Sequence, residues 1–193
     1  MDNELKNALS ALELGKTILY PTDTLWGIGC DASSDNATKK IFKIKRRDYS
    51  NPLICLASSF EMVKDYADID EIDKCKQISE ESPTTFIFNN PKKISNFILG
   101  NNNSVAFRVP KNNFCIKLIE ALGRPIVSTS ANFSGYKVPV NFNDIDPIIK
   151  ANVGYVVQLE KNKHCNLSSR ILKYNYENDC FIKLRWTILK MIY

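Results

Sequence analysis

Short apolar runs alternate with helical patterns along most of this chain. The runs Thr17–Tyr20, Pro52–Ala57, Thr84–Asn89 and Ser104–Pro110 are rich in β-branched and aromatic residues, which is typical of buried strands. Between them lie segments whose apolar residues recur at helical spacing. This alternation predicts an α/β fold with helices packed on a central sheet.

The remaining segments complete this prediction. Helical spacing is found near residues 4–15 and in Asp35–Arg47, Phe60–Ala67, Glu71–Glu80, Asn112–Gly123 and Asp144–Asn152. Further strands are expected at Pro125–Ser130, Tyr155–Glu160, Ser168–Tyr174 and Cys180–Leu189. Because the last three strands have no helices between them, the sheet should be mixed rather than purely parallel.

Length and composition favour one globular domain over residues 1–193, since 44% of the residues are hydrophobic and no linker divides the chain. The net charge of +5 suits anionic ligands such as nucleotides or RNA. No apolar stretch approaches the roughly 20 residues that a membrane span needs. The N-terminal segment carries acids and has no signal-peptide pattern, which favours a cytoplasmic protein without membrane contacts.

The six cysteines are widely scattered and form no C-x-x-C pair. Several lie inside apolar runs, so free buried thiols in a reducing compartment are favoured over disulfides or a metal site. The one histidine, His164, stands in a polar run and is expected on the surface. The residues around it show no nucleophile arrangement.

Four polar segments each lie at the end of an apolar run. They are "YPTDTLWGIGCDA" (Tyr20–Ala32), "KIKRRDYSNPL" (Lys43–Leu53), "NSVAFRVP" (Asn103–Pro110) and "STSANFSG" (Ser128–Gly135). In the first, Gly27 and Gly29 allow close backbone approach or unusual dihedral angles. A tight turn capped by aspartate or threonine explains that segment equally well.

The second segment carries a cluster of cations. On a continuous helix, Lys43 and Arg47 would share one face, and Asn51-Pro52 would return the chain to the sheet edge. Ligands of α/β folds commonly bind at such an edge, and arginine beside lysine suits a phosphate or carboxylate. A solvated helix end that benefits from the helix dipole is the alternative.

Arg108 and the serine-rich segment are the other candidates for ligand binding. Arg108 stands between Phe107 and Val109 in a strand, so it faces away from both, with Ser104 on its own side. It is either a surface residue or the partner of an anion or an acidic side chain. Alternating polar side chains in Ser128–Gly135 can hold phosphate or carboxylate oxygens, although the S-x-S-x-N pattern alone is a weak signal of ligand binding.

Together, the four segments resemble those of the YrdC-like threonylcarbamoyl-adenylate synthase family, in the same order and at similar separations. A weaker fifth match is "SSRI" (Ser168–Ile171), followed by "LRW" (Leu184–Trp186). The resemblance extends over roughly residues 4–187. It implies a twisted mixed sheet flanked by helices with a large, basic, concave cleft, in the short single-domain form (TsaC type).

The resemblance also implies an activity. Such nucleotidyltransferases make threonylcarbamoyl-AMP from L-threonine, bicarbonate and ATP and release pyrophosphate. A partner transferase then uses the product to make N6-threonylcarbamoyladenosine at position 37 of tRNA. ATP would be a substrate, with Mg²⁺ held by its triphosphate rather than by protein ligands. The tRNA itself is a further candidate partner.

Site residues follow from the matching positions. L-Threonine would be bound by Thr24, Arg108, Ser128 and Ser169, with Arg108 as the carboxylate fork. ATP would be bound by Lys45, Arg47, Asn51, Ser104, Ser130, Asn132 and Arg185. Of these, Lys45 and Arg47 would act catalytically on the phosphates, and we expect replacing them to stop turnover without harming the fold.

Three departures from the family pattern leave alternatives open. Leu56 stands where many relatives carry histidine, Glu81–Pro83 replaces a Pro-Gly-Pro loop, and Trp186-Thr187 replaces a glycine after Arg185. One alternative is an RNA-binding YrdC-like module without synthase activity. Another is a retained fold whose activity has drifted to a different substrate or a regulatory role.

Overall fold

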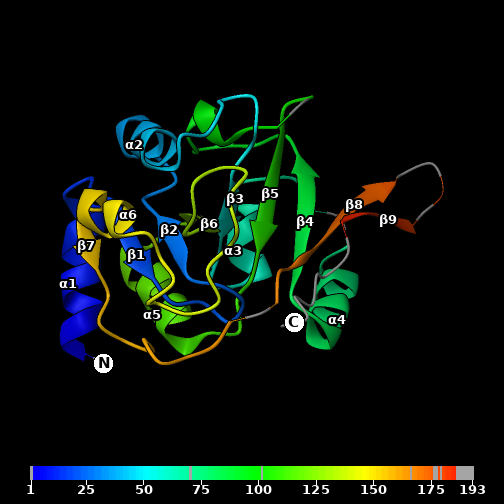
Figure 1. Cartoon of the computed structure of the whole chain (residues 1–193). Helices are drawn as coiled ribbons and strands as arrows, with labels where there is room; N and C mark the ends of the chain where they lie inside the picture. The colour runs from blue at the N-terminus through cyan, green and yellow to red at the C-terminus, as the bar shows by residue number, and fades with distance from the viewer. Residues whose placement is uncertain are drawn as a thin grey trace.

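The computed structural model describes residues 2–69, 71–100, 102–165, 167–175, 178 and 180–185, and of Arg185 only the backbone. Figure 1 shows helices packed around one central sheet. The helices are α1 (Asp2–Glu13), α2 (Asp35–Lys45), α3 (Phe60–Lys64), α4 (Ile72–Glu81), η1 (Asn96–Ile98), α5 (Asn113–Leu122) and α6 (Pro147–Asn152). The strands are β1 (Ile18–Tyr20), β2 (Gly27–Gly29), β3 (Ile54–Leu56), β4 (Thr84–Asn89), β5 (Ser104–Arg108), β6 (Ile126–Ser130), β7 (Tyr155–Val156), β8 (Arg170–Asn175) and β9 (Cys180–Arg185).

The sheet is mixed, as the sequence predicts, with the strand order β7-β1-β2-β6-β3-β5-β4-β8-β9. Parallel pairs are β1 with β7, β3 with β5 and β4 with β8, whereas β6 runs antiparallel to both of its neighbours. Strand β6 therefore joins the two halves of the sheet, and the polar segment at its end lies near the middle of the molecule.

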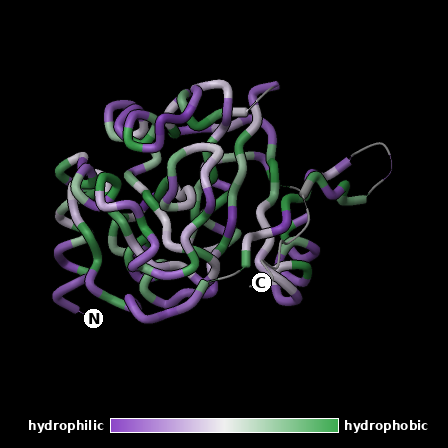
Figure 2. The backbone as a smooth tube through the Cα atoms, in the orientation of Figure 1, coloured by the Kyte–Doolittle hydropathy of each residue, from purple (hydrophilic) through white to green (hydrophobic). Residues whose placement is uncertain are grey.

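Both faces of the sheet are covered by apolar side chains, because successive strand residues point to opposite faces. One face, with Leu19, Cys55 and Phe107, packs against α2, α3, α4 and α6. The other, with Tyr20 and Leu56, packs against α1 and α5. Figure 2 shows hydrophobic residues along the central strands and an alternation of hydrophilic and hydrophobic residues along the helices.

Helix α2 ends earlier than the sequence predicts. Ser34 caps its start by accepting a hydrogen bond from the Ala37 N–H, but the helix stops at Lys45 because Arg46 adopts a left-handed conformation with φ of 50°. The Arg47 N–H then bonds to the Phe42 carbonyl, which is the pattern of a Schellman end. The expectation that Lys43 and Arg47 share a helical face is therefore wrong.

Other differences are smaller. The run Tyr155–Glu160 forms a strand only at Tyr155–Val156, and this strand lies at the opposite edge of the sheet from β8 and β9. Residues 186–189 of the last expected strand lie outside the described part of the chain.

All cysteines are free and five are buried, but Cys180 is exposed. Within the described residues, no helix combines the length and apolar character needed to cross a membrane.

The glycines after Tyr20 form β2 rather than a tight turn, and neither has a positive φ. Close approach is what requires glycine at position 29, where a Cβ atom would collide with the Val127 carbonyl oxygen and lie 2.8 Å from Tyr20 Cε1. At Gly27 the nearest atom, Ser128 Oγ, would be 3.2 Å away and belongs to a small side chain.

We expect Gly29→Ala to lower the free energy of unfolding by about 3 kcal/mol, because a backbone carbonyl cannot move aside without breaking the β2–β6 pairing. Gly27→Ala is the matched control and should cost about 1 kcal/mol. Urea denaturation of both variants measures the difference. Equal stability of the two would contradict this account of position 29.

Candidate active site

One cavity of about 440 Å³ brings most of the predicted site residues together. The predicted residues that line it are Thr24, Arg47, Arg108, Ser128, Ser130 and Ser169. They come from the β1–β2 loop, the segment after α2, the end of β5, the end of β6 and the segment before β8. Six positions that are far apart in the sequence therefore share one concave surface.

Strand pairing gives the cavity two ends. Leu56 pairs with Arg108, and Ile54 pairs with Ser128, so Arg108 and Ser128 lie on successive rows of the same sheet face. Pro52 and Arg47 lie beyond Ile54, next to the end of β6 at Ser130. At about 3.3 Å per residue, the four steps from Leu56 to Pro52 separate the two ends by roughly 13 Å.

Arg108 dominates one end. Its Nη1 donates a hydrogen bond of 2.7 Å to Oδ1 of Asp23, and the two side chains are only 6% and 13% exposed. The Arg108 side chain makes no other hydrogen bond within the described residues. Nε and Nη2 therefore remain for an anionic ligand, and the ion pair fixes the direction in which they point.

Hydroxyl groups surround this arginine. Thr24 and Thr22 Oγ1 atoms lie 3.0 Å apart, and the Thr22 hydroxyl also donates to the Leu25 carbonyl at 2.7 Å. Ser169 Oγ lies 2.8 Å from Thr85 Oγ1. Because these side chains are held by neighbours before any ligand arrives, the Arg108 end offers preorganised donors and acceptors beside one guanidinium.

Arg47 lies at the other end of the cavity. Its Nε donates to the Asn51 carbonyl at 3.1 Å and its Nη2 to the Pro52 carbonyl at 2.9 Å. Partial burial lowers the pKa of the guanidinium, which nevertheless stays charged. Asn51 thus contributes through its carbonyl oxygen, and its exposed side chain is absent from the cavity lining.

Lys45 is a buried cation behind the cavity wall rather than a lining residue. It is 1% exposed, and its Nζ donates to the carbonyl oxygens of Ser130 and Asn132, the latter at 2.7 Å. No acidic partner of Lys45 is found in the described part of the chain. The ammonium therefore ties the end of α2 to the polar segment that follows β6.

Asn132 belongs to the same scaffold. Its Oδ1 accepts a 2.6 Å hydrogen bond from the Ser130 hydroxyl, and its Nδ2 donates to the carbonyls of Phe133 and Tyr136 at 3.0 and 2.7 Å. Its amide thus shapes the loop and orients Ser130. The abundance of small polar residues in Ser128–Gly135 is explained by these internal bonds together with the exposed cavity wall.

Of the predicted ATP residues whose side chains the structure describes, only Arg47 and Ser130 line the cavity, and Ser104 joins Lys45, Asn51 and Asn132 outside its lining. Ser104 begins β5, is 8% exposed and is absent from the cavity lining, while its carbonyl accepts a hydrogen bond from the Gly100 N–H at 2.8 Å. The side chain of Arg185 lies outside the described residues. Their roles remain predictions.

Sequence reasoning missed Asp23 and Leu56 as parts of the site. Asp23 lies inside the first polar segment, but nothing in its spacing indicates that it pairs with an arginine 85 positions later. Leu56, which is fully buried, lines the cavity beside Arg108. The pairing of β3 with β5, which the sequence pattern does not reveal, places Leu56 beside Arg108.

Burial, together with the nearby charge of Arg47, lowers the pKa of Lys45 to about 7. Because an unfolded lysine titrates near 10.5, the unfolded state binds more protons between pH 7 and 10.5, so this group makes stability rise with pH in that window. We expect the stability of the wild type relative to Lys45→Met to rise by up to about 1.4 kcal/mol per pH unit. Denaturant unfolding of both proteins at several pH values measures this difference, and a flat or falling difference would contradict it.

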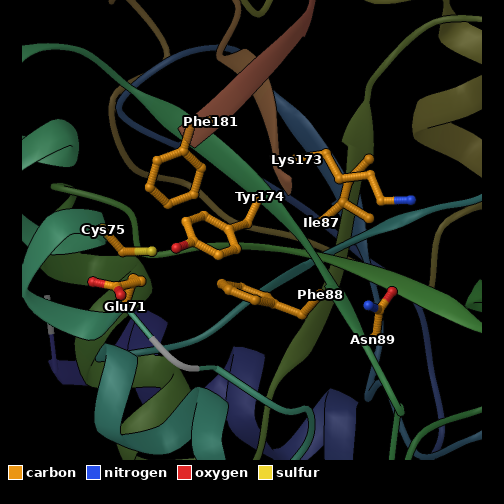
Figure 3. A pocket seen from close by; sticks show the side chains of 8 residues that line it. All are labelled: Glu71, Cys75, Ile87, Phe88, Asn89, Lys173, Tyr174 and Phe181. Carbon is orange, nitrogen blue, oxygen red and sulfur yellow. The ribbon is translucent and has the colours of Figure 1, made fainter. Parts of the chain in front are cut away.

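A second hollow lies between α4 and the strands β4, β8 and β9 (Figure 3). The rings of Phe88, Tyr174 and Phe181 gather there beside Cys75. Its volume of about 10 Å³ is close to that of one water probe, so it cannot hold a substrate. The larger cavity is therefore the candidate active site.

Comparison with known proteins identifies the family. Residues 10–185 match the family model of Sua5, YciO and YrdC proteins, which is described as "Telomere recombination". The threonylcarbamoyl-AMP synthase of Xanthomonas euvesicatoria is 31% identical over 161 residues, covering 81% of this chain and 86% of the relative. The synthase of Escherichia coli is 31% identical over 170 residues, covering 80% and 90%.

Solved structures agree. P. abyssi Sua5 complexed with L-threonine superposes with a TM-score of 0.84 at 25% identity, covering 97% of this chain and 55% of the longer archaeal chain. E. coli YciO gives a TM-score of 0.82 at 20% identity, with 98% and 92% coverage, and supports the fold. The predicted single-domain α/β fold is thereby confirmed, and the chain belongs to the Sua5/YciO/YrdC family.

Proposed function

We propose that this protein is an L-threonylcarbamoyladenylate synthase, a nucleotidyltransferase that joins threonine, bicarbonate and the AMP part of ATP. The observation that carries the proposal is the single cavity with Arg108 at one end and Arg47 with Ser130 at the other. An amino acid and a nucleotide must meet in this reaction. The roughly 13 Å between the two ends gives room for both.

The Arg108 end is assigned to L-threonine. The free Nε and Nη2 groups of Arg108 suit a carboxylate, because a guanidinium matches the two carboxylate oxygens in geometry and charge. Thr24, Ser128 and Ser169 line the same end and offer hydroxyls to the substrate's polar groups. The relative that is complexed with L-threonine in its solved structure supports this assignment.

The Arg47 end is assigned to ATP. Arg47 and Ser130 line the cavity and would contact the phosphates, where a cation stabilises the charge that builds up on the departing pyrophosphate. Lys45 and Asn132 hold the wall that carries Ser130. We propose that Asn51, Ser104 and Arg185 also belong to the ATP site. Asn51 would act through its carbonyl oxygen, which fixes the position of Arg47.

The chemistry needs positioning rather than a protein nucleophile. The threonine amine attacks the carbon of CO2 with loss of a proton, or that of bicarbonate with loss of water, to give a carbamate. An oxygen of the carbamate then attacks the α-phosphorus of ATP as pyrophosphate leaves. Holding both reactants in one cavity converts this encounter into an intramolecular step. Arg108 and Arg47 would fix the two anionic ends while hydroxyl groups orient the reacting atoms.

A Mg²⁺ ion bound to the triphosphate would neutralise phosphate charge in this reaction. The described residues contain no cluster of three or more histidine, cysteine or acidic side chains that could hold a metal. The donor set therefore fits an ion that arrives with the nucleotide. Arg47 would then act alongside the ion rather than as its ligand.

The product would pass to a threonylcarbamoyl transferase that modifies adenosine 37 of tRNA. The names of the two relatives support only the synthesis of threonylcarbamoyl-AMP, which precedes this transfer. The alternative of an RNA-binding module without synthase activity is not favoured, because both relatives named above are synthases. A drifted activity would require a different ligand at Arg108 or Arg47.

Pyrophosphate release tests the proposal. Purified protein with L-threonine, bicarbonate, ATP and Mg²⁺ should release pyrophosphate, and omission of L-threonine or bicarbonate should stop the release. L-Serine and tRNA serve as comparisons, the latter in a binding titration at 150 mM salt. No release, release that L-serine supports equally well, or salt-sensitive tRNA binding without ATP binding would reject the assignment.

A further inference from the structure

We propose that this protein uses CO2 rather than bicarbonate as its carbon source, and that CO2 reacts over a strip of aliphatic side chains in the middle of the cavity. Ile54, Ala106 and Ile87 form this aliphatic strip. The inference rests on the proposed function and adds the form of inorganic carbon that the cavity accepts.

The aliphatic strip lies between the two ends of the cavity. Ile54 pairs with Ala106 and Ala106 with Ile87, so the three side chains form one row across β3, β5 and β4, which are neighbours in the sheet (Figure 1). All three line the cavity and are only partly buried. Arg108 lies one row beyond the strip in one direction and Ser130 one row beyond it in the other. Each row corresponds to two residues, or roughly 7 Å.

This position is that of the reacting carbon. In the proposed reaction, the threonine carboxylate is bound at Arg108 and the phosphates are bound at Arg47 and Ser130, which line the cavity at its two ends. The carbon atom must join the threonine nitrogen to the oxygen that attacks phosphorus, so it lies between these bound groups. The aliphatic strip is the surface that the cavity presents there.

The row that contains the strip brings no charge to the cavity. Ser128, which pairs with Ile54, contributes an uncharged hydroxyl. Lys173 pairs with Ile87 at the outer end of the row but does not line the cavity. A bicarbonate ion placed here would give up hydration without gaining an opposite charge from this row, which is costly. CO2 is uncharged and has no dipole moment, so an aliphatic surface suits it.

Bicarbonate would also need a proton donor. When an amine attacks bicarbonate, the hydroxide that is expelled must be protonated to leave as water. The described residues that line the cavity include no aspartate, glutamate, histidine, cysteine, lysine or tyrosine, and those that carry charge are Arg47 and Arg108. Because arginine is not deprotonated in proteins, neither can supply this proton.

CO2 removes this requirement. The free amine of threonine adds its nitrogen lone pair to the CO2 carbon, the electron pair of one C=O π bond moves onto oxygen, and one N–H proton passes to water. The product is the carbamate that then attacks the α-phosphorus. The Ser128 hydroxyl, in the same row as the strip, would donate to the oxygen that gains charge.

The early time course of pyrophosphate release identifies the form of carbon that reacts. Uncatalysed interconversion of CO2 and bicarbonate is slow in the cold, so wild-type reactions can be started with either form. A start with dissolved CO2 should give a burst that declines to a steady rate, and a start with bicarbonate should give a lag. Carbonic anhydrase should abolish both. A burst with bicarbonate, or identical time courses without carbonic anhydrase, would overturn the inference.

Two variants of Ile54 separate capture of CO2 in the cavity from binding of a carbamate that has formed in solution. Threonine and valine have nearly the same shape, so Ile54→Thr and Ile54→Val differ by one hydroxyl on the strip. That hydroxyl holds water that CO2 must displace, so the KM for inorganic carbon should be at least about threefold higher in Ile54→Thr. The KM values for L-threonine and ATP should be the same in both variants, and unfolding curves check that both fold.

The opposite result has a clear meaning. Bicarbonate and a carbamate from solution are both anions, and an anion would accept a hydrogen bond from the added hydroxyl. A KM for inorganic carbon that is equal or lower in Ile54→Thr than in Ile54→Val would therefore reject the capture of CO2 over the strip.

These outcomes distinguish the inference from the proposed function. A wild type that releases no pyrophosphate with either form of carbon would reject the synthase assignment and the inference with it. A wild type that releases pyrophosphate in a threonine-dependent reaction, but with a burst from bicarbonate, would reject the use of CO2 alone.

Discussion

Arg108→Gln is expected to lower kcat/KM for L-threonine by about 100-fold or more, while the KM for ATP stays nearly unchanged. Loss of a charge-assisted bond to a carboxylate in a water-poor site costs about 3 kcal/mol, and each 1.4 kcal/mol corresponds to tenfold. Arg47, which lies at the other end of the cavity, is untouched. Initial rates of pyrophosphate release at varied L-threonine and ATP measure the two effects separately.

Stability is the necessary control for Arg108→Gln. The substitution leaves the largely buried carboxylate of Asp23 unpaired, which can cost about 3–5 kcal/mol of folding free energy. The double variant Arg108→Gln with Asp23→Asn removes the unpaired charge, so it should recover much of that stability without recovering threonine binding. Threonine affinity that survives in either variant would end the assignment of Arg108 to the carboxylate.

Lys45→Met should reduce both turnover and stability, the former by about 100-fold and the latter by about 3 kcal/mol. The ammonium joins α2 to the loop after β6, and without it the carbonyls of Ser130 and Asn132 each lose a hydrogen bond. The sequence-based expectation that replacement leaves the fold intact therefore does not suit this position, because Lys45 is 1% exposed.

Arg47→Gln is the matched comparison for Lys45→Met. Its bonds go to carbonyls in an exposed turn, so its loss should change stability by no more than about 1 kcal/mol. The KM for ATP should rise by about tenfold or more, because a guanidinium that lines the cavity is lost. Unfolding curves and initial-rate kinetics of both variants distinguish a structural role of Lys45 from direct contact with phosphate. If Lys45→Met kept wild-type stability and raised only the KM for ATP, Lys45 would contact phosphate directly.

The sequence was sufficient to predict most of the strands, although not β2, and the side on which key residues lie. Arg108 had to lie on the sheet face opposite to Phe107 and Val109, since strand residues alternate, and it lines the cavity on that face. The polar runs at strand ends likewise converge, because strand ends meet at common edges of a sheet. Local periodicity alone carries this information.

Contacts between distant segments could not be predicted in the same way. The left-handed conformation of Arg46, which ends α2 early, is rare for a non-glycine residue, and no glycine marks it in the sequence. Nor does local sequence show that the Lys45 ammonium meets carbonyls more than 80 positions later. Both features depend on packing between α2 and the segment after β6, which only the folded chain defines.

The central place of β6 has a consequence for how the chain acquires its structure. During synthesis from the N-terminus, β2 is made about 100 residues and β3 about 70 residues before β6, the strand that lies between them. Until residues 126–130 have left the ribosome, both strands keep an unpaired edge, and such edges favour aggregation. The exit tunnel holds roughly 30 residues, so β6 emerges when the nascent chain is about 160 residues long. We expect shorter nascent chains to need chaperone protection, and we expect the chain to become compact once β6 has emerged.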